Sequence, residues 1–208
     1  MIVYLVRHGL SAANVARRVT GTPADGLTDA GRRQAQDLGH WVREAGIRPD
    51  LFLVSHWQRA RETANLIFPE AEWLEERRLG ETDAGSVADL PLDGFLASWP
   101  DFYASPANNY PEGESHLALD ERVQAFWADL CARQAQSLFI VTHSGPISCV
   151  LQHVLGIGMD RFPAFLPTHA SVSVLEAGAG PDGEVGYFRL KAFSLGPLPG
   201  IASAVNAS

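Results

Sequence analysis

The chain has few cysteines, no excess of positive charge and no long apolar run, and each shortage excludes a class of protein. Its 208 residues include two cysteines, Cys131 and Cys149, which form no metal-ligand spacing with each other. We interpret both as small apolar residues in helices. The formal net charge of −8 argues against nucleic acid as a partner, because phosphate backbones attract basic surfaces. No uncharged apolar run approaches the ~20 residues of a bilayer-spanning helix, so no membrane association is expected.

The N-terminus and the overall composition favour a small cytoplasmic protein. Met1-Ile2-Val3 leads directly into an apolar segment, so no signal peptide is expected and the cytoplasm is the predicted compartment. With 46% hydrophobic residues, residues 1–208 can bury one core, which predicts a single domain. No His, Asp or Glu spacing is typical of a metal site. Nothing in the sequence indicates the oligomeric state.

Two histidines follow apolar runs that have the character of buried strands. Residues 2–6 run into Arg7-His8-Gly9, and residues 138–142 run into His143-Ser144-Gly145. A lone histidine in this position is often structural, but a pair in the same context favours a shared site. The carboxyl ends of strands are where α/β proteins bind ligands.

A third apolar run ends near the same type of side chain. Residues 51–55 are followed by His56 and then by Arg59 in a predicted helix over 59–67. Another helix is predicted to begin at Pro146, which puts Ser144 and Gly145 at a helix N-terminus, where free amides favour an anion. These three strand ends predict a locally cationic site in an acidic chain.

Five short segments, spread over most of the chain, carry recognisable motifs in a fixed order. They are Arg7-His8-Gly9 with Asn14, Leu27-Thr28-x-x-Gly31-x-x-Gln34-Ala35, Ser55-x-x-x-Arg59-Ala60-x-x-Thr63-Ala64, Pro111-x-Gly113-Glu114-Ser115 and Thr142-His143-x-Gly145. Together they resemble the signatures of the histidine phosphatase superfamily, also called the phosphoglycerate mutase-like family.

The alternation of elements predicts an α/β fold. Further helices are expected over 30–45, with Thr28 as N-cap, and over 117–133, and two more strands over 171–176 and 186–193. The expected architecture is a three-layer α/β/α sandwich with a mostly parallel central sheet. The last two strands are joined by a predicted Gly-Pro-Asp-Gly turn, and residues 195–208 are expected to form a mobile tail.

Glycine and proline interrupt residues 79–116, which predicts a lid-like insertion over the strand ends. The segment is interpreted as too short to have a core of its own. It contains the aromatic residues Phe95, Trp99, Phe102 and Tyr103. These side chains are expected mainly to pack the insertion, with the alternative that one or two line a substrate pocket.

The resemblance implies a phosphohistidine mechanism in which His8 becomes phosphorylated. An imidazole is a good nucleophile toward phosphorus when its protonation state is fixed. Arg7, Arg59 and His143 are the residues expected to stabilise the charge on the phosphoryl oxygens, and the fork of arginine suits two oxygens at once. No metal and no cofactor is expected.

The leaving oxygen needs a proton, and the candidate acids lie in the segment Leu74-Glu75-Glu76-Arg77-Arg78-Leu79-Gly80-Glu81. Alignment with the family pattern favours Glu76 as general acid and later base. Glu81 is the second candidate and Glu75 the third. The alternative is that this charged cluster is only a solvated surface.

Six further residues are expected to bind the substrate or its phosphate: Asn14, Thr20, Gly21, Ser144, Gly145 and His169. Thr20-Gly21 stands where the family often has Gln-Gly, so this pair departs from the family pattern. After Gly80, Thr82-Asp83-Ala84 departs from the Trp-Glu-Gly of many relatives, which predicts an unusual entry into the insertion and an unusual choice of substrate.

The resemblance therefore predicts a histidine acid-type phosphatase, a phosphomonoesterase acting on a small phosphorylated metabolite. Two alternatives stay open at this point. One is a cofactor-dependent phosphoglycerate mutase, which would need a bisphosphate primer. The other is a non-catalytic module that binds a phosphate ligand. The sequence does not identify the ester.

Overall fold

A six-stranded sheet forms the middle layer of the protein, as a computed structural model shows for residues 1–133, 135–180 and 185–197. The strands are β1 (Ile2–Arg7), β2 (Leu51–Val54), β3 (Trp73–Glu75), β4 (Ser137–Thr142), β5 (Ser171–Ala179) and β6 (Val185–Leu195). Their order across the sheet is β3-β2-β4-β1-β5-β6. The pairs β3–β2, β2–β4 and β4–β1 are parallel, whereas β1–β5 and β5–β6 are antiparallel. The mostly parallel sheet expected from the sequence is confirmed.

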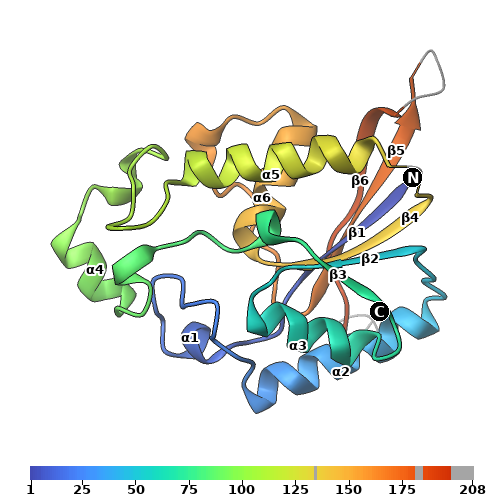
Figure 1. Ribbon diagram of the computed structural model, residues 1–208, viewed down its shortest axis with the longest axis horizontal. Coiled ribbons are helices and arrows are strands. Elements are labelled where there is room, and N and C mark those ends of the chain that lie inside the picture. The colour runs from blue at the N-terminus through green and yellow to red at the C-terminus, as the bar shows by residue number, and fades with distance from the viewer. Residues whose placement is uncertain (134, 181–184, 198–208) are drawn as a thin grey trace, which may run out of the picture.

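Helices cover both faces of the sheet (Figure 1). On one face lie α2 (Asp29–Glu44) and α3 (Gln58–Ile67), and on the other lie α5 (His116–Cys131) and α6 (Ser144–Leu155). Two short helices, α1 (Ala12–Val15) and α4 (Leu92–Ser98), belong to neither layer. The three-layer α/β/α architecture is therefore confirmed.

Local sequence explains where the layer helices begin. The Thr28 hydroxyl accepts a hydrogen bond from the Gly31 amide, and the Ser115 hydroxyl accepts one from the Ala118 amide. Each is an N-cap that satisfies an amide without a partner in its own helix. The apolar faces of the helices then pack on the sheet, with α2 and α3 against Val6 and α5 and α6 against Leu5. Neighbouring residues of one strand thus serve the two cores, because side chains alternate across a strand.

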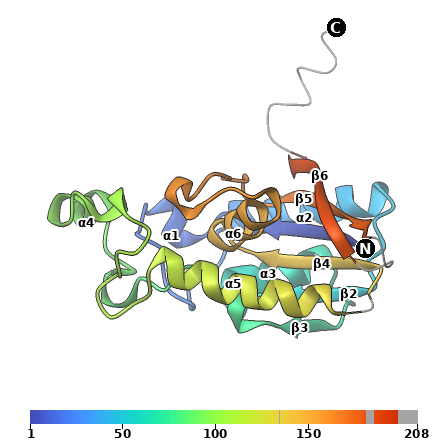
Figure 2. The ribbon, with the colours of Figure 1, turned by 90° about the horizontal axis from the view of Figure 1, so that it is seen from above.

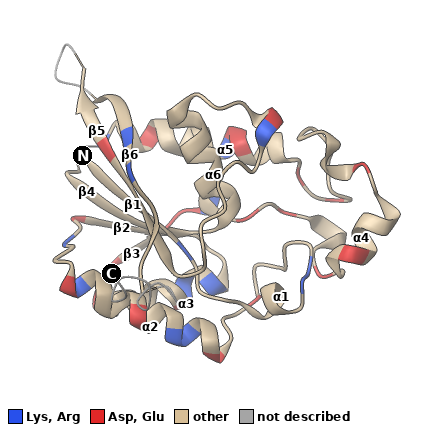
Figure 3. Ribbon diagram, turned by 180° about the vertical axis from the view of Figure 1, so that it is seen from behind, with Lys and Arg blue, Asp and Glu red and all other residues tan. Residues whose placement is uncertain are grey.

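The carboxyl end of β1 faces the part of the molecule that contains α1 and α4. Figure 1 and Figure 2 both show these two helices beyond that end of the sheet, on the side away from the N-terminus. Figure 3 shows charge mainly on helices and loops, and in the central strands β1, β2 and β4 the only charged residue is Arg7, at the carboxyl end of β1. No helix among the described residues is both long and apolar enough to cross a membrane.

Two expectations about local structure were wrong. The strand β3 was not expected; it pairs in parallel with β2, Leu53 being level with Leu74. The insertion also has a small hydrophobic cluster of its own, centred on Phe95, Phe102 and Tyr110, although it was expected to be too short for one. Aromatic side chains make this possible, because each buries a large apolar area. The expected tail lies mostly outside the described residues, as do residues 181–183 of the expected Gly-Pro-Asp-Gly turn.

Candidate active site

His8 stands just past the end of β1 and is almost fully buried, at 2% exposure. Its Nδ1 atom lies 2.7 Å from the carbonyl oxygen of Gly9, which can only accept a hydrogen bond. Nδ1 must therefore carry the proton, and Nε2 keeps a free electron pair. Consistently, Nε2 accepts a hydrogen bond from Arg59 Nε at 3.0 Å. Burial, with the positive charges of Arg59 and Arg7, lowers the pKa of His8 well below its usual value, so the ring is neutral.

Arg59, in the first turn of α3, is held on three sides. Its NH1 group pairs with the carboxylate of Asp25 at 3.2 Å, and its NH2 group donates to the carbonyl oxygen of Thr20 at 3.2 Å. The guanidinium also lies 4.4 Å from the centre of the Trp57 ring, a cation–π distance. With 1% of its surface exposed, Arg59 is fixed beside His8 rather than free to move.

Two more histidines surround His8. The ring centres of His143 and His169 lie 4.9 and 5.7 Å from that of His8. His143 Nε2 is 2.8 Å from the hydroxyl of Ser55, which gives that residue of the sequence motif a structural role. Burial is the main cause that lowers the pKa of His143 well below its usual value, and burial next to Arg7 and Arg59 lowers the pKa of His169 to about 3.

Arg7 completes the cationic side of the site. It is partly buried at the end of β1, and its NH1 group donates to the carbonyl oxygen of Pro167 at 2.6 Å. Three buried nitrogen atoms near His8 have no hydrogen-bond partner among the described residues: Arg7 Nε, His143 Nδ1 and His169 Nε2. Unpaired buried polar atoms are costly, and of these three residues Arg7 lines the pocket and can meet an oxyanion there.

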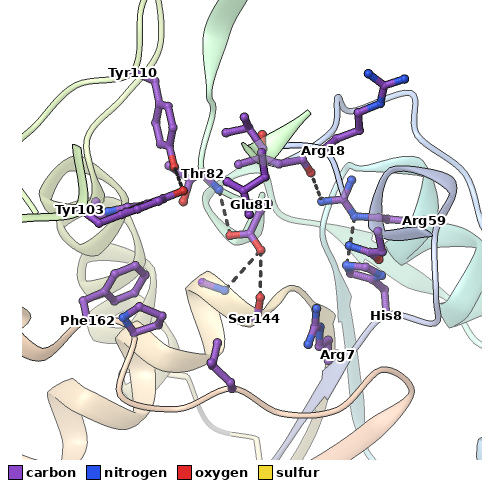
Figure 4. Close-up of a pocket in the computed structure, with 18 residues that line it drawn as sticks. Arg7, His8, Arg18, Arg59, Glu81, Thr82, Tyr103, Tyr110, Ser144 and Phe162 are labelled. Carbon is purple, nitrogen blue, oxygen red and sulfur yellow. Dashed lines mark hydrogen bonds between the residues drawn. The ribbon is translucent and has the colours of Figure 1, made fainter. Parts of the chain in front are cut away.

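Glu81 reaches the N-terminus of α6. Its carboxylate accepts from the Gly145 amide at 3.3 Å and lies 3.4 Å from the Ser144 hydroxyl. A β-carbon at position 145 would lie 2.2 Å from this carboxylate, so glycine leaves room for Glu81 in its present position. In Figure 4 the carboxylate of Glu81 lies in the middle of the pocket, between the cationic side with His8 and a side lined by aromatic rings. It is therefore well placed to exchange a proton with a bound ester.

The position of Glu76 does not fit the role of acid that the sequence pattern favoured. Its carboxylate accepts from the Arg78 amide and pairs with the Arg78 guanidinium at 2.8 Å, and the residue does not line the pocket. Hydrogen bonds from Arg78 lower the pKa of Glu76, which favours the carboxylate over the acid. Glu75 forms a solvent-exposed pair with Arg61. Of the three candidates, Glu81 is the one that the fold brings to the pocket.

Arg122 of α5 anchors the segment that carries Glu81. It donates to the carbonyl oxygens of Arg78, Gly80 and Glu81 at 2.6, 3.0 and 2.9 Å. It also forms a two-pronged pair with Glu114, whose other contact is the Asp83 amide at 2.8 Å. Glu114 of the sequence motif therefore does not reach the pocket itself. It supports the residues on either side of Thr82, Glu81 through Arg122 and Asp83 directly.

The remaining expected binding residues divide into two groups. Asn14 and Thr20 line the pocket, and the Asn14 amide oxygen accepts from the backbone and hydroxyl of Ser11. Gly21 does not line it; its φ of 73° and its closeness to Ala13 require glycine, which allows the Thr20 carbonyl to meet Arg59. His169 contacts the site through His8 rather than from the wall of the pocket.

The pocket has a volume of about 420 Å³, and its second side is aromatic. This side includes Tyr103, Tyr110, His116 and Phe162. Of the four aromatic residues singled out in the insertion, Tyr103 lines the pocket, while Phe95 and Phe102 pack inside the insertion. Asp25, Arg122 and His116 were not singled out from the sequence. Asp25 and Arg122 lie far along the chain from the groups they hold, and His116 looked like an ordinary helical residue, so no local signal could have found them.

Among the described residues, no group of three or more His, Cys, Asp or Glu side chains is arranged to hold a metal ion. Among the described residues, those that line the pocket with His8 include hydrogen-bond donors and one carboxylate, that of Glu81. Such a set suits an anionic group attached to an oxygen that must gain or lose a proton.

The chain belongs to the histidine phosphatase superfamily (branch 1), whose sequence profile matches residues 3–183. The probable phosphoglycerate mutase GpmB of Proteus mirabilis is 33% identical over 165 residues, which cover 74% of this chain and 75% of that protein. The 6-phosphofructo-2-kinase/fructose-2,6-bisphosphatase of Gallus gallus is 26% identical over 197 residues, 91% of this chain. The chain spans 40% of the length of that relative.

Solved structures share the fold. A putative alpha-ribazole-5'-P phosphatase from Escherichia coli superposes with a TM-score of 0.79 at 24% identity, covering 93% of this chain and 95% of that one. The mycobacterial glucosyl-3-phosphoglycerate phosphatase gives a TM-score of 0.79 at 24% identity, with coverage of 93% and 98%. Family membership supports a phosphatase or another phosphoryl-transfer activity for this chain.

Proposed function

We propose that this protein is a phosphomonoesterase that hydrolyses a small phosphate ester through a phosphohistidine at His8, with Glu81 as general acid and base. The observation that carries the proposal is the state of the His8 ring: it is neutral, its proton is on Nδ1, and Nε2 faces the Arg59 guanidinium. A neutral imidazole with a free pair at a cationic site is the form that attacks phosphorus.

The reaction has two steps. In the first, His8 Nε2 forms a bond to phosphorus, the bond from phosphorus to the ester oxygen breaks, and protonated Glu81 gives its proton to the leaving oxygen. In the second, the Glu81 carboxylate takes a proton from water, the hydroxide attacks phosphorus, and the bond to Nε2 breaks to release phosphate. The Gly9 carbonyl, which accepts from Nδ1, stabilises the positive charge of the phosphorylated ring. Arg7 and Arg59 stabilise the phosphoryl oxygens.

The test is phosphate release from simple phosphomonoesters, without metal and without a primer. His8→Ala is expected to abolish release. Glu81→Gln is expected to lower the rate of hydrolysis of esters with poor leaving groups by about 10²–10⁴-fold, the usual contribution of a general acid. The hydrolysis of activated aryl esters should be slowed much less. Glu76→Gln is the matched control, five positions earlier in the chain, and is expected to leave turnover unchanged.

Two outcomes would overturn parts of this proposal. If Glu76→Gln, rather than Glu81→Gln, produces the dependence on the leaving group, the acid is Glu76 after all. If the native chain releases phosphate from none of the esters, it is not a phosphomonoesterase of this kind.

A phosphoglycerate mutase is a second candidate, supported by the 33% identity to a probable phosphoglycerate mutase. It would require a bisphosphate primer to phosphorylate His8. Transfer between positions of a phosphoglycerate that occurs only with the primer, with no net release of phosphate, would favour the mutase. Tight binding of phosphate with neither activity would indicate a binding module.

A further inference from the structure

The side of the pocket opposite the cationic site is a continuous aromatic surface built by three separate segments. Tyr103 comes from the insertion, His116 from the start of α5, and Phe162 from the segment before β5. The Tyr103 and His116 rings are nearly parallel, at 12°, with centres 5.8 Å apart, and the Phe162 ring centre is 4.9 Å from that of His116. The result is an apolar wall with flat ring faces.

The protein covers this wall only in part, because His116 is 9% exposed but side chains around it are more open. Tyr103 is 50% exposed, and Leu166, which lines the same pocket, is 64% exposed. By contrast, Phe95 in the core of the insertion is fully buried. Exposed apolar side chains beside a cavity gain free energy when an apolar group covers them, and their gathering at one pocket favours a ligand over chance.

Among the described residues, the aromatic side offers no cation to pair with a second negative charge. The three cations among the described residues that line the pocket are Arg7, Arg59 and Arg18. The first two face the phosphoryl site, and the third donates to the carbonyl oxygen of Asp89, with its guanidinium directed away from His8 in Figure 4. On the aromatic side itself, the hydroxyls of Tyr103 and Tyr110 bond to each other at 3.1 Å. An anionic group there would lose water without gaining a cationic partner.

Glu81 lies between the two sides of the pocket, as Figure 4 shows. If the phosphoryl group is at His8 and the ester oxygen at Glu81, the rest of the substrate extends onto the aromatic wall. We infer that the substrates of this chain are phosphate monoesters whose leaving group carries a flat, unsaturated ring and no second anionic group. This inference rests on the proposed phosphomonoesterase function.

Four esters of primary alcohols separate ring shape from charge: ethyl, benzyl, cyclohexylmethyl and 4-carboxybenzyl phosphate. Benzyl phosphate is expected to have the highest kcat/KM. It should exceed cyclohexylmethyl phosphate, which has a ring of similar size that is not flat, by about fivefold, the scale of an aromatic pair. The carboxylate of 4-carboxybenzyl phosphate should reduce kcat/KM by about tenfold, the scale of one unpaired polar group.

Variants locate the preference on the wall. Phe162→Leu and Tyr103→Leu keep apolar volume but remove a flat face, so each should reduce the ratio of benzyl to cyclohexylmethyl turnover toward one. Tyr103→Phe keeps the ring and should keep the ratio. Tyr187→Leu is the matched control, because Tyr187 is similarly exposed, at 47%, but lies on β6 and does not line this pocket.

Failure of this inference is distinct from failure of the proposed function. If ethyl phosphate and the other esters are hydrolysed in a His8-dependent way, but cyclohexylmethyl or 4-carboxybenzyl phosphate equals or exceeds benzyl phosphate, the substrate class is wrong and the function stands. If the native chain hydrolyses none of the four, the function fails and the substrate class fails with it.

Discussion

The two sides of the active-site pocket differ in how firmly the fold holds them. On the cationic side, His8, Arg59 and His143 are each exposed by 2% or less, and each is tied to a neighbour by a hydrogen bond of 3.0 Å or shorter. On the aromatic side, Tyr103 exposes half of its surface, whereas Tyr110 and His116 are buried, at 3% and 9%. The cationic side is therefore buried throughout, whereas the aromatic side is buried only in part.

The difference follows from what carries each side. His8 and His143 follow the parallel strands β1 and β4, which are in register with Arg7 level with Thr142, so the sheet sets their separation. Tyr103 and Phe162 belong to connecting segments with only short helical turns. Residues on such segments can change without disturbing a sheet, which makes them suitable for determining specificity. Three changes would break or sharpen this contrast.

The largest effect is expected from Asp25→Ala. This change removes the carboxylate that pairs with the buried Arg59 guanidinium and accepts from the Ala13 amide at 2.9 Å. Removing one partner of a buried pair leaves a charge without compensation, so the free energy of unfolding should fall by about 3 kcal/mol. Urea-induced unfolding measures it.

The control for this change is Asp93→Ala, which removes the same type of side chain from an exposed pair with Arg17. An exposed ion pair contributes little to stability, so the free energy of unfolding should fall by less than about 1 kcal/mol. Equal losses for the two variants would show that the cationic side is not held more firmly than the surface.

A smaller effect is expected from Arg122→Lys. Lysine keeps the charge but cannot span Glu114 and three carbonyl oxygens at once, so the backbone that carries Glu81 should lose its fixed position. We expect kcat/KM to fall by about tenfold more for benzyl phosphate than for 4-nitrophenyl phosphate, because only the poorer leaving group depends on the acid.

Arg43→Lys is the matched control, since Arg43 also donates to a backbone carbonyl, that of Ile67, but on α2. Arg43→Lys should reduce kcat/KM for benzyl phosphate and for 4-nitrophenyl phosphate equally or not at all. If Arg122→Lys also slows both esters equally, its role is support of the fold and not of the acid.

The smallest effect is a pH dependence of stability that arises at His169. Its pKa is about 3 in the folded chain, against about 6.5 when unfolded. Between these two pH values the unfolded chain binds a proton that the folded chain does not. The contribution of His169 to the free energy of unfolding is therefore fully present above about pH 6.5 and is lost as the pH falls. After allowance for the partial exposure of its side chain, His169 should lower the free energy of unfolding by about 1 kcal/mol between pH 7 and pH 5.

His169→Gln removes this contribution and keeps a polar side chain of similar length. The unfolding free energies of the native chain and the variant, each measured at pH 7 and at pH 5, should therefore differ in slope. His8 and His143, whose pKa values are also lowered, contribute equally to both proteins. Parallel slopes would show that His169 titrates normally in the folded state.

The candidate general acid shows which features the sequence predicts and which it does not. All three candidates were expected in the segment from Leu74 to Glu81, and the pattern favoured Glu76, whereas Glu81 lies at the pocket. The choice depends on Arg78, which binds Glu76, and on Arg122, which anchors the segment from α5. Arg122 lies more than forty residues away, and that proximity is not visible in the local pattern.

The sequence by itself determined the strands that end in Arg7-His8 and His143, the helices that follow them and hence the edge where the chemistry lies. Apolar runs, N-caps and strand-end polar residues are local features, and each is specified by a few neighbouring residues. Only the tertiary structure decided that Asp25 holds Arg59, that Glu81 reaches α6, and that His116 meets Tyr103 and Phe162. Those contacts join segments that are distant in the chain, and packing of the whole fold sets which of them meet.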